Sequence, residues 1–311
     1  MLNIIGKRFW FFLVSGVLIL IAVISLATFG LKPSIEFSSG SMLTVRLETP
    51  VEYDVFQQEI SSLGYTDAIV QKTGAGDYLI RTKELSDEQK AQLEAGLASR
   101  FGKLSEASFS SVSPMVASET ARNAGIAVAL AMVGMLLYVT WAFRKMPRPF
   151  RWGTCFVIAL LHDILVTVGL FSLLGGLLGW EINLMFITGI LAIVGVSLDN
   201  TIVVFDRMRE NQKMGVSPDF EIVVNRSQIE TLGRSLNTTI TIIITCIALL
   251  LFVGGTIQNF VVVLLIGLIA GTFDSVFVAP GLLVVWDKKE WGRFIGRKPQ
   301  PKVQPAAARA R

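Results

Sequence analysis

Hydrophobic residues occur along this chain in long uninterrupted runs rather than in short alternating segments. A helix needs about 20 apolar residues to cross a hydrocarbon core of ~30 Å, so six of the runs are long enough to span a membrane. They are Trp10–Leu31, Ala124–Phe143, Thr154–Leu174, Ile182–Phe205, Leu236–Val253 and Phe260–Val285. The pattern predicts an α-helical integral membrane protein with six transmembrane helices.

The pattern changes in residues 32–119, between the first and second runs. Alternating or amphipathic segments there follow the order β-α-β-β-α-β, which is typical of a small α+β ferredoxin-like domain. The expected strands are Ser41–Glu48, Thr66–Lys72, Asp77–Lys83 and Leu104–Val112, and the expected helices are Val51–Leu63 and Ser86–Phe101. A turn is expected at residues 73–76. Ser86 and Gln89 have the spacing of a capping box at the start of the second helix.

Charge supports the same division of the chain. Overall 52% of the residues are hydrophobic and only 17% are charged, whereas residues 32–119 contain 13 acidic and 8 basic residues, a net charge of −5. Lys and Arg flank the spans on one side, which places both termini in the cytoplasm by the positive-inside rule. The expected layout is a cytosolic N-terminus and first helix (1–31), an external domain (32–119), a five-helix bundle (120–287) and a basic cytosolic tail (288–311).

Asp199 is the most unusual residue of the fourth span, because ionisable groups inside a membrane are costly and are functional candidates by default. It precedes Arg207 by eight residues, so it lies about 12 Å deeper along the helix. Ser197, Asn200 and Thr201 beside it are also polar. A carboxylate there either takes up a proton or forms a hydrogen-bond clamp to a neighbouring helix, and both interpretations remain open.

Arg234 opens a polar stripe on the fifth span. Thr238, Thr241 and Thr245 follow it at helical spacing, so the four share one face, which we expect to point into the bundle. Arg234 keeps its charge and is therefore a natural counter-ion for Asp199. The alternative is that Arg234 extends to the nearby cytosolic interface.

Four further intramembrane positions carry polar or charged groups. His162 and Asp163 are adjacent, so they should point about 100° apart and not share one partner. A polar contact within the bundle is favoured for them over a proton relay. Asp206 adjoins Arg207 and suits either a boundary ion pair or a part in transport. Asp274 lies in the sixth run, and no role follows for it from the sequence.

No enzyme motif is present in the sequence. It lacks HExxH, CxxC, GxxxxGK[ST] and GxSxG, and it contains a single histidine, which argues against a zinc site or a catalytic triad. We therefore expect no enzyme activity, no metal and no cofactor. The basic tail suits contact with anionic lipid or ribosomal RNA, but simple positive-inside anchoring is the favoured interpretation, and no specific nucleic-acid partner is expected.

Several segments together resemble the SecF family of bacterial membrane proteins. They are Gly195–Asn211 (GVSLDNTIVVFDRMREN), Gln228–Thr239 (QIETLGRSLNTT), His162-Asp163 and Phe252–Gly255. The resemblance implies membership of the resistance-nodulation-division superfamily, location in the bacterial cytoplasmic membrane, and pairing with SecD as a 6+6 helix bundle. It further implies work beside the SecYEG channel, where the proton-motive force draws preproteins outward.

Two positions depart from the family pattern. Much of the family has Asn-Asp-Thr in the fourth span, where this chain has Asp199-Asn200-Thr201, so Asn200 holds the place of the usual acid. Either Asp199 replaces that acid on a rotated helix, or coupling rests on the partner subunit. The family's Asp-Phe-x-Gly-Gly appears as residues 36–40 (EFSSG), with one glycine lost, so we expect a reshaped turn.

The sequence therefore predicts a proton-coupled accessory subunit of the preprotein translocase. Asp199 would be the protonatable group, Arg234 its counter-ion, and Asn200, Thr201 and Thr238 polar lining. The partners implied are SecD, SecYEG, preprotein and the lipid bilayer. Two alternatives remain: half of a small-molecule exporter of the same superfamily, and a structural subunit without proton coupling. Co-purification from native membranes would separate the exporter from the translocase subunit.

Overall fold

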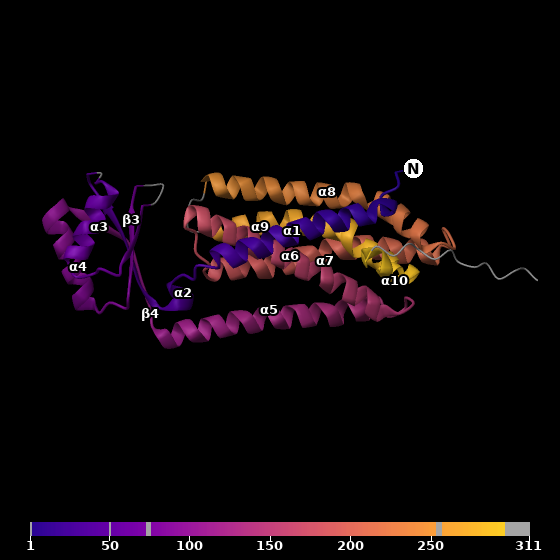
Figure 1. Ribbon diagram of the computed structural model, residues 1–311, viewed down its shortest axis with the longest axis horizontal. Coiled ribbons are helices and arrows are strands. Elements are labelled where there is room, and N and C mark those ends of the chain that lie inside the picture. Colours follow the sequence, from indigo (N-terminus) through magenta and orange to yellow (C-terminus); the bar gives the residue numbers. More distant parts are fainter. Residues whose placement is uncertain (1, 50, 73–75, 253–256, 296–311) are drawn as a thin grey trace, which may run out of the picture. The chain divides into compact units, whose positions relative to one another are not determined.

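The computed structural model describes residues 2–49, 51–72, 76–252 and 257–295 (Figure 1). Within these residues, six helical stretches are long and apolar enough to cross a membrane. They are Ile5–Phe29, Pro114–Ala142, Pro149–Leu178, Leu184–Lys213, Phe220–Phe252 and Gln258–Lys288. The predicted fold class, six transmembrane helices with a small α+β domain, is confirmed. Parts of the expected turns at 73–76 and 252–255, and the tail from residue 296, lie outside the described residues.

All but the first of the spanning helices are longer than the apolar runs that predicted them. The first four spans are α1 (Arg8–Phe29), α5 (Pro114–Ala142), α6 (Pro149–Leu178) and α7 (Leu184–Lys213). The fifth is α8 (Phe220–Phe252), and the sixth combines α9 (Gln258–Phe273), a π-helical segment η3 (Asp274–Val278) and α10 (Ala279–Lys288). Hydropathy marks only the part of a helix that lies in lipid, and a helix continues beyond it wherever no Pro or Gly stops it.

The α+β domain has the predicted order of elements. Strands β1 (Gly40–Leu47), β2 (Ile69–Lys72), β3 (Tyr78–Thr82) and β4 (Leu104–Val112) form one antiparallel sheet in the order β2-β3-β1-β4. The helices are α3 (Tyr53–Ser62) and α4 (Asp87–Phe101), and Ser86 and Gln89 form the predicted capping box of α4. The core packs apolar residues of both helices against the sheet, with Phe56 stacked on Tyr78 at 4.0 Å between ring centroids.

The turn that precedes β1 keeps its left-handed backbone although one glycine is replaced. It follows the short helix α2 (Ile35–Ser38). Ser39 has φ +64° and Gly40 has φ +116°, so the serine occupies a conformation that favours glycine. A Cβ atom on Gly40 would lie 2.4 Å from the carbonyl oxygen of Thr82, so β1 can pair with β3 here only without a side chain. Ser39 therefore adopts a backbone conformation that a glycine would adopt at lower cost.

The chain divides into two compact units. One contains Met1–Phe29, Leu130–Leu173 and the chain from Gly189 onward, and the other contains Gly30–Ala129 with Leu174–Thr188. The first unit contains most of the spanning helices. A cluster of stacked aromatic rings lies at one end of its core, where Phe143 stacks on Trp152 at 5.2 Å and both meet the edge of Phe205. This packed core holds the polar groups described next.

Candidate intramembrane site

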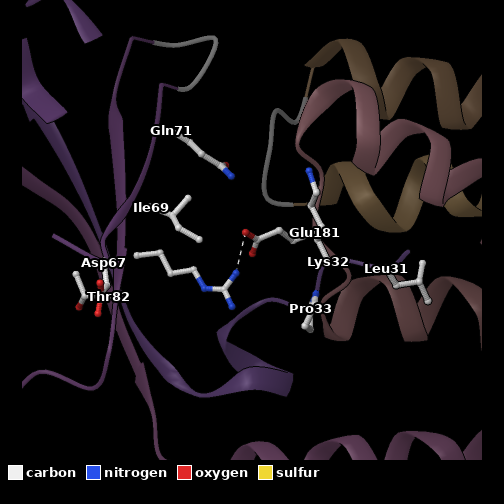
Figure 2. Close-up of a pocket in the computed structure, with 9 residues that line it drawn as sticks. Leu31, Lys32, Pro33, Asp67, Ile69, Gln71, Thr82 and Glu181 are labelled. Carbon is white, nitrogen blue, oxygen red and sulfur yellow. Dashed lines mark hydrogen bonds and ion pairs between the residues drawn. The ribbon is translucent and has the colours of Figure 1, made fainter. Parts of the chain in front are cut away.

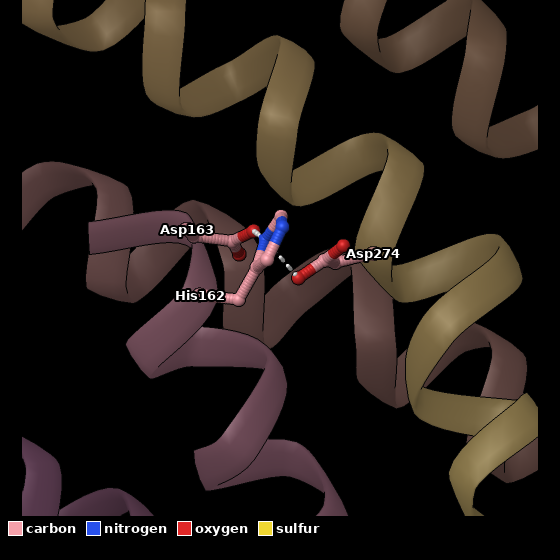
Figure 3. Close-up of side chains that lie close together, drawn as sticks. All are labelled: His162, Asp163 and Asp274. Atoms are coloured by element: carbon pink, nitrogen blue, oxygen red, sulfur yellow. Dashed lines mark ion pairs between the residues drawn. The ribbon is translucent and has the colours of Figure 1, made fainter. Parts of the chain in front are cut away.

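Three ionisable side chains meet in the interior of the helical unit (Figure 3). His162 and Asp163 come from α6, and Asp274 comes from the first position of η3. His162 Nδ1 lies 2.6 Å from Asp274 Oδ2 and 3.6 Å from Asp163 Oδ1. His162 is 5% exposed and both aspartates are 0% exposed. The cluster therefore joins the third span to the sixth within a water-poor environment.

Two expectations from the sequence change at this cluster. The prediction that adjacent His162 and Asp163 cannot share a partner is wrong, because the longer imidazole side chain reaches across to the space between α6 and η3, where Asp163 also lies. Asp274 had no assigned role, and the structure makes it the partner of His162. The sequence did show that Asp274 is an acid within an apolar run. However, the pattern of residues along one helix does not indicate which neighbouring helix a side chain faces.

Asp163 accepts hydrogen bonds at both its carboxylate and its backbone carbonyl. Ser197 Oγ of α7 donates a hydrogen bond to its Oδ2 at 2.8 Å. The Thr167 hydroxyl, one turn later on α6, donates to the Asp163 carbonyl at 2.7 Å. A Cβ atom on Gly271 would lie 3.1 Å from Asp163 Oδ2, so the glycine of α9 leaves room for the carboxylate. Ser197, predicted only as a polar neighbour of Asp199, thus orients a different acid.

A second polar contact connects α7, α8 and α9. The Asn200 amide donates to Thr272 Oγ1 at 3.5 Å, and Thr272 shares a 2.7 Å hydrogen bond with Thr239. Thr201 is also buried, and its hydroxyl makes no hydrogen bond within the described residues. Asn200 and Thr201 therefore line the interior, whereas the residue before them does not.

Asp199, Arg234 and Thr238 lie on the exposed surface of the helical unit. Among the residues that the structure describes, Asp199 and Arg234 form no ion pair with each other. The polar stripe of α8 that was expected to face the interior therefore points outward, and that expectation is wrong for the chain by itself. The interior side of α8 is a different line of small polar residues, Ser227, Gln228, Thr231, Ser235 and Thr239. Helix α8 therefore has two faces with polar residues, one buried and one exposed. Periodicity alone did not identify which of the two faces is buried.

Charged residues at one end of α7 and α8 form surface pairs. Asp206 pairs with Arg209, one turn further along the helix, rather than with adjacent Arg207. Arg207 Nε instead lies 2.7 Å from Glu230 of α8, and Asn211 donates to the same carboxylate at 2.8 Å. These contacts tie the two helices together at their polar ends.

A cleft of about 480 Å³ lies in the unit that contains the sheet (Figure 2). Arg81 of β3 and Glu181 of the loop between α6 and α7 form a 2.9 Å ion pair within it. Burial raises the pKa of Glu181, although Arg81 opposes that shift. The pair connects the sheet to the loop, and Ser34 N donates to the Ile182 carbonyl at 2.9 Å beside it.

Comparison with known proteins identifies close relatives. The family described as "Protein export membrane protein SecD/SecF, C-terminal" matches residues 92–289, and "SecD/SecF GG Motif" matches residues 24–51. The chain is 42% identical to the protein translocase subunit SecF of Thermobaculum terrenum, covering 99% of both chains. It is 39% identical to SecF of Anaerolinea thermophila over 97% of this chain and 99% of that one.

A solved structure supports the same relationship. The crystal structure of SecDF, a translocon-associated membrane protein from Thermus thermophilus, superposes with a TM-score of 0.81 at 31% identity. The match covers 92% of this chain and 38% of that longer chain. A second SecDF structure, in the super-membrane-facing form, superposes with a TM-score of 0.65 at 28% identity over 96% of this chain and 40% of that one.

Proposed function

The chain belongs to the SecD/SecF family of protein-export membrane proteins, and from that premise we propose that it is an accessory subunit of the Sec preprotein translocase. It pairs with SecD, works beside SecYEG, and uses the proton-motive force to promote export of preproteins. Both termini lie in the cytoplasm and the sheet domain lies outside. The membrane-spanning character of the chain and its relatives named as translocase subunits support this proposal.

The observation that carries the pairing is the polar surface of the helical unit. Asp199 of α7 and Arg234 and Thr238 of α8 are exposed although they lie on membrane-spanning helices. Charged groups that face lipid are costly, so such residues normally face other helices or water-filled cavities. A second helix bundle that covers this surface removes the cost. The relative from Thermus thermophilus, in which the match occupies only 38% of a longer chain, has room for such a second half.

We assign the proton path of the assembled complex to this surface. Asp199 is the protonatable group and Arg234 its counter-ion, brought together or bridged once the partner half excludes lipid. Thr238 lies on the same surface, while Asn200 and Thr201 line the interior directly behind it. Asn200 cannot bind a proton itself, so Asp199 beside it is the protonatable group at this level of the fourth span.

Secretion at different values of the proton-motive force tests this function. Wild-type and Asp199→Asn chains are expressed in cells depleted of the native protein, and export of a reporter preprotein is followed with and without a protonophore. We expect the wild type to lose export when the protonophore is added, and Asp199→Asn to export slowly in both conditions. An Asp199→Asn chain that exports at the wild-type, protonophore-sensitive rate would exclude Asp199 as the proton carrier.

Co-purification tests the partner. Gentle solubilisation of native membranes should recover this chain with SecD and the SecYEG channel. Recovery with a different six-span half would instead support a small-molecule exporter. In both cases the exposed Asp199 and Arg234 surface is the contact to examine by site-specific crosslinking.

A further inference from the structure

The cluster of His162, Asp163 and Asp274 lies in the buried interior of the helical unit and shares no residue with the proton path proposed above. Asp163 follows the start of α6 by 14 residues, and Asp274 follows the start of α9 by 16 residues. At 1.5 Å per residue, Asp163 lies about 21 Å and Asp274 about 24 Å from the start of its span, near the middle of the bilayer. Asp163 and Asp274 are the only buried acids within the described spans. A carboxylate there has almost no water to stabilise its charge.

The charges of the cluster do not balance within the chain. Among the described residues, its electrostatic partners are its own three members and the Ser197 hydroxyl of α7. The other helices packed against η3 contribute uncharged groups: α8 provides the Gln228 amide, which donates to the Val276 carbonyl, and α1 provides Phe11, which stacks on Phe277. Two carboxylates and one imidazolium leave a net charge of −1, so neutrality requires one additional proton or cation.

Unused hydrogen-bonding atoms show that the cluster is not a saturated structural clamp. Both ring nitrogens of His162, Asp163 Oδ1 and both carboxylate oxygens of Asp274 are buried and form no hydrogen bond within the described residues. Asp163, by contrast, accepts a hydrogen bond from Ser197 through its Oδ2 atom. The imidazole ring lies between the two carboxylates (Figure 3). Asp274 is therefore the acid that is better able to accept a proton.

We propose that this cluster reversibly binds one proton on the Asp274 carboxylate, and that binding weakens the tie between the third and sixth spans. The proton adds to an Asp274 oxygen, which then no longer attracts the His162 imidazolium at full strength. His162 can transfer its pairing to Asp163 Oδ1, 3.6 Å away. Proton binding at this site does not depend on the proposed translocase function, although its use in transport does.

The local backbone suits such a change. The π-helical segment η3 begins at Asp274 and runs to Val278, inside an otherwise α-helical span. Single π-helical turns are energetically unfavourable and are frequent at functional sites. When His162 releases Asp274, η3 loses the contact that holds its first residue toward α6. The segment can then return toward an α-helical register, which would rotate the residues that follow it.

The distances favour a proton over a metal ion. Candidate ligand atoms of the three residues all lie within 4.8 Å of one another. However, His162 Nδ1 and Asp274 Oδ2 are only 2.6 Å apart. Two ligands of one zinc ion, each roughly 2 Å from it in tetrahedral geometry, are separated by roughly 3.3 Å. The observed separation is too short for two ligands of one metal ion and instead matches a direct ion pair between the imidazolium and the carboxylate.

Infrared spectroscopy of the full-length chain in lipid nanodiscs tests the proposal directly. Protonated carboxylic acids have a carbonyl stretching band that ionised carboxylates lack, and isotope labelling of aspartate carboxyl groups separates aspartate from glutamate. We expect the wild type to show an isotope-shifted band that titrates with pH and exchanges slowly in deuterated buffer. Asp274→Asn should lose that band. Asp287→Asn, the same change at the exposed end of the same span, should retain it.

Further variants make the outcome decisive even if Asp274→Asn fails to fold. Asp274→Glu should keep a titrating band that no longer shifts with the aspartate label. Removal of the cation in His162→Gln should tighten proton binding about tenfold. A band that still shifts with the aspartate label in folded Asp274→Glu would overturn the proposal. A band that is lost in Asp199→Asn rather than in Asp274→Asn would also overturn it.

Two additional measurements distinguish proton binding from cation binding and from coupled transport. The titration is repeated with sodium and with potassium as the only monovalent cation, and we expect the same midpoint in both. A shift specific to sodium would overturn the proton assignment in favour of a cation site. The titration measures proton binding to the chain itself. A normal Asp274 band together with secretion that does not depend on the proton-motive force would therefore contradict the proposed function and not this proton site.

Discussion

At the scale of single residues, Ser39 is the clearest case in which the chain tolerates strain. It combines φ +64° with ψ 171°, a region that essentially only glycine occupies at low cost. A residue other than glycine in this region destabilises the folded state by about 1–3 kcal/mol. Glycine avoids that strain but loses more conformational entropy on folding, which costs about 0.5–1 kcal/mol. We therefore expect Ser39→Gly to stabilise the sheet domain by about 1 kcal/mol, measured by hydrogen exchange of strand β1. Ser38→Gly is the control: it lies in helix α2, and we expect it to destabilise.

Asp77 links the stability of the same domain to pH. The hydrogen bonds from Arg46 to its carboxylate, 2.6 and 2.9 Å long, lower the pKa of Asp77. Because the folded pKa lies below the unfolded value of about 3.9, the stabilisation is present above that value and is lost as pH falls through the folded pKa. Protection of strand β3 against hydrogen exchange, corrected for intrinsic rate, should therefore fall below about pH 4 in the wild type. Asp77→Asn should lack this pH-dependent part, and an identical profile in both proteins would contradict the assignment.

At the scale of elements, the sequence was sufficient for the spans and the order of the sheet but not for where the helices end. The run that predicted the fifth span begins at Leu236, whereas α8 begins at Phe220. The intervening part of α8 has a polar side that contacts α7, as the ion pair between Glu230 and Arg207 shows. A hydropathy pattern does not detect a helical segment of this kind. Strand boundaries were predicted within a few residues because alternation is read directly from the pleat.

The contact between α1 and α6 depends on a small residue. A Cβ atom on Gly169 would lie 2.3 Å from the Cβ atom of Ala22, so the two helices approach as closely as backbones allow. Small residues at such crossings provide the van der Waals contact that joins helices in membranes. We expect Gly169→Ala to destabilise the chain by about 1–3 kcal/mol in detergent, measured by thermal unfolding. Gly134→Ala on α5 meets no atom within 4 Å and should leave stability unchanged or raise it slightly.

At the scale of the whole molecule, the sequence identified the polar residues of the spans but not their arrangement. Asp199, Asn200 and Thr201 are consecutive, yet the first is exposed and the other two are buried. Asp274 was assigned no role, although it is the partner of His162. Burial in a bundle depends on how helices rotate against one another, and the apolar surface of a membrane helix gives little indication of that rotation. Pairs between spans therefore required coordinates.

Arg234 provides the test of whether the exposed polar surface belongs to a larger assembly. It makes no ion pair within the described part of the chain, so Arg234→Ala should change the thermal stability of the purified chain by less than about 0.5 kcal/mol. If the surface is covered by SecD, the same change leaves an acid or a dipole of the complex unpaired and weakens association by about 2–5 kcal/mol.

Arg207→Ala is the matched comparison: Arg207 pairs with Glu210 and Glu230 within the chain, so the purified chain itself should lose stability. Affinity for SecD in nanodiscs, measured beside unfolding temperature, separates the two variants. An Arg234→Ala chain that unfolds early but binds SecD normally would show that the arginine serves this chain alone.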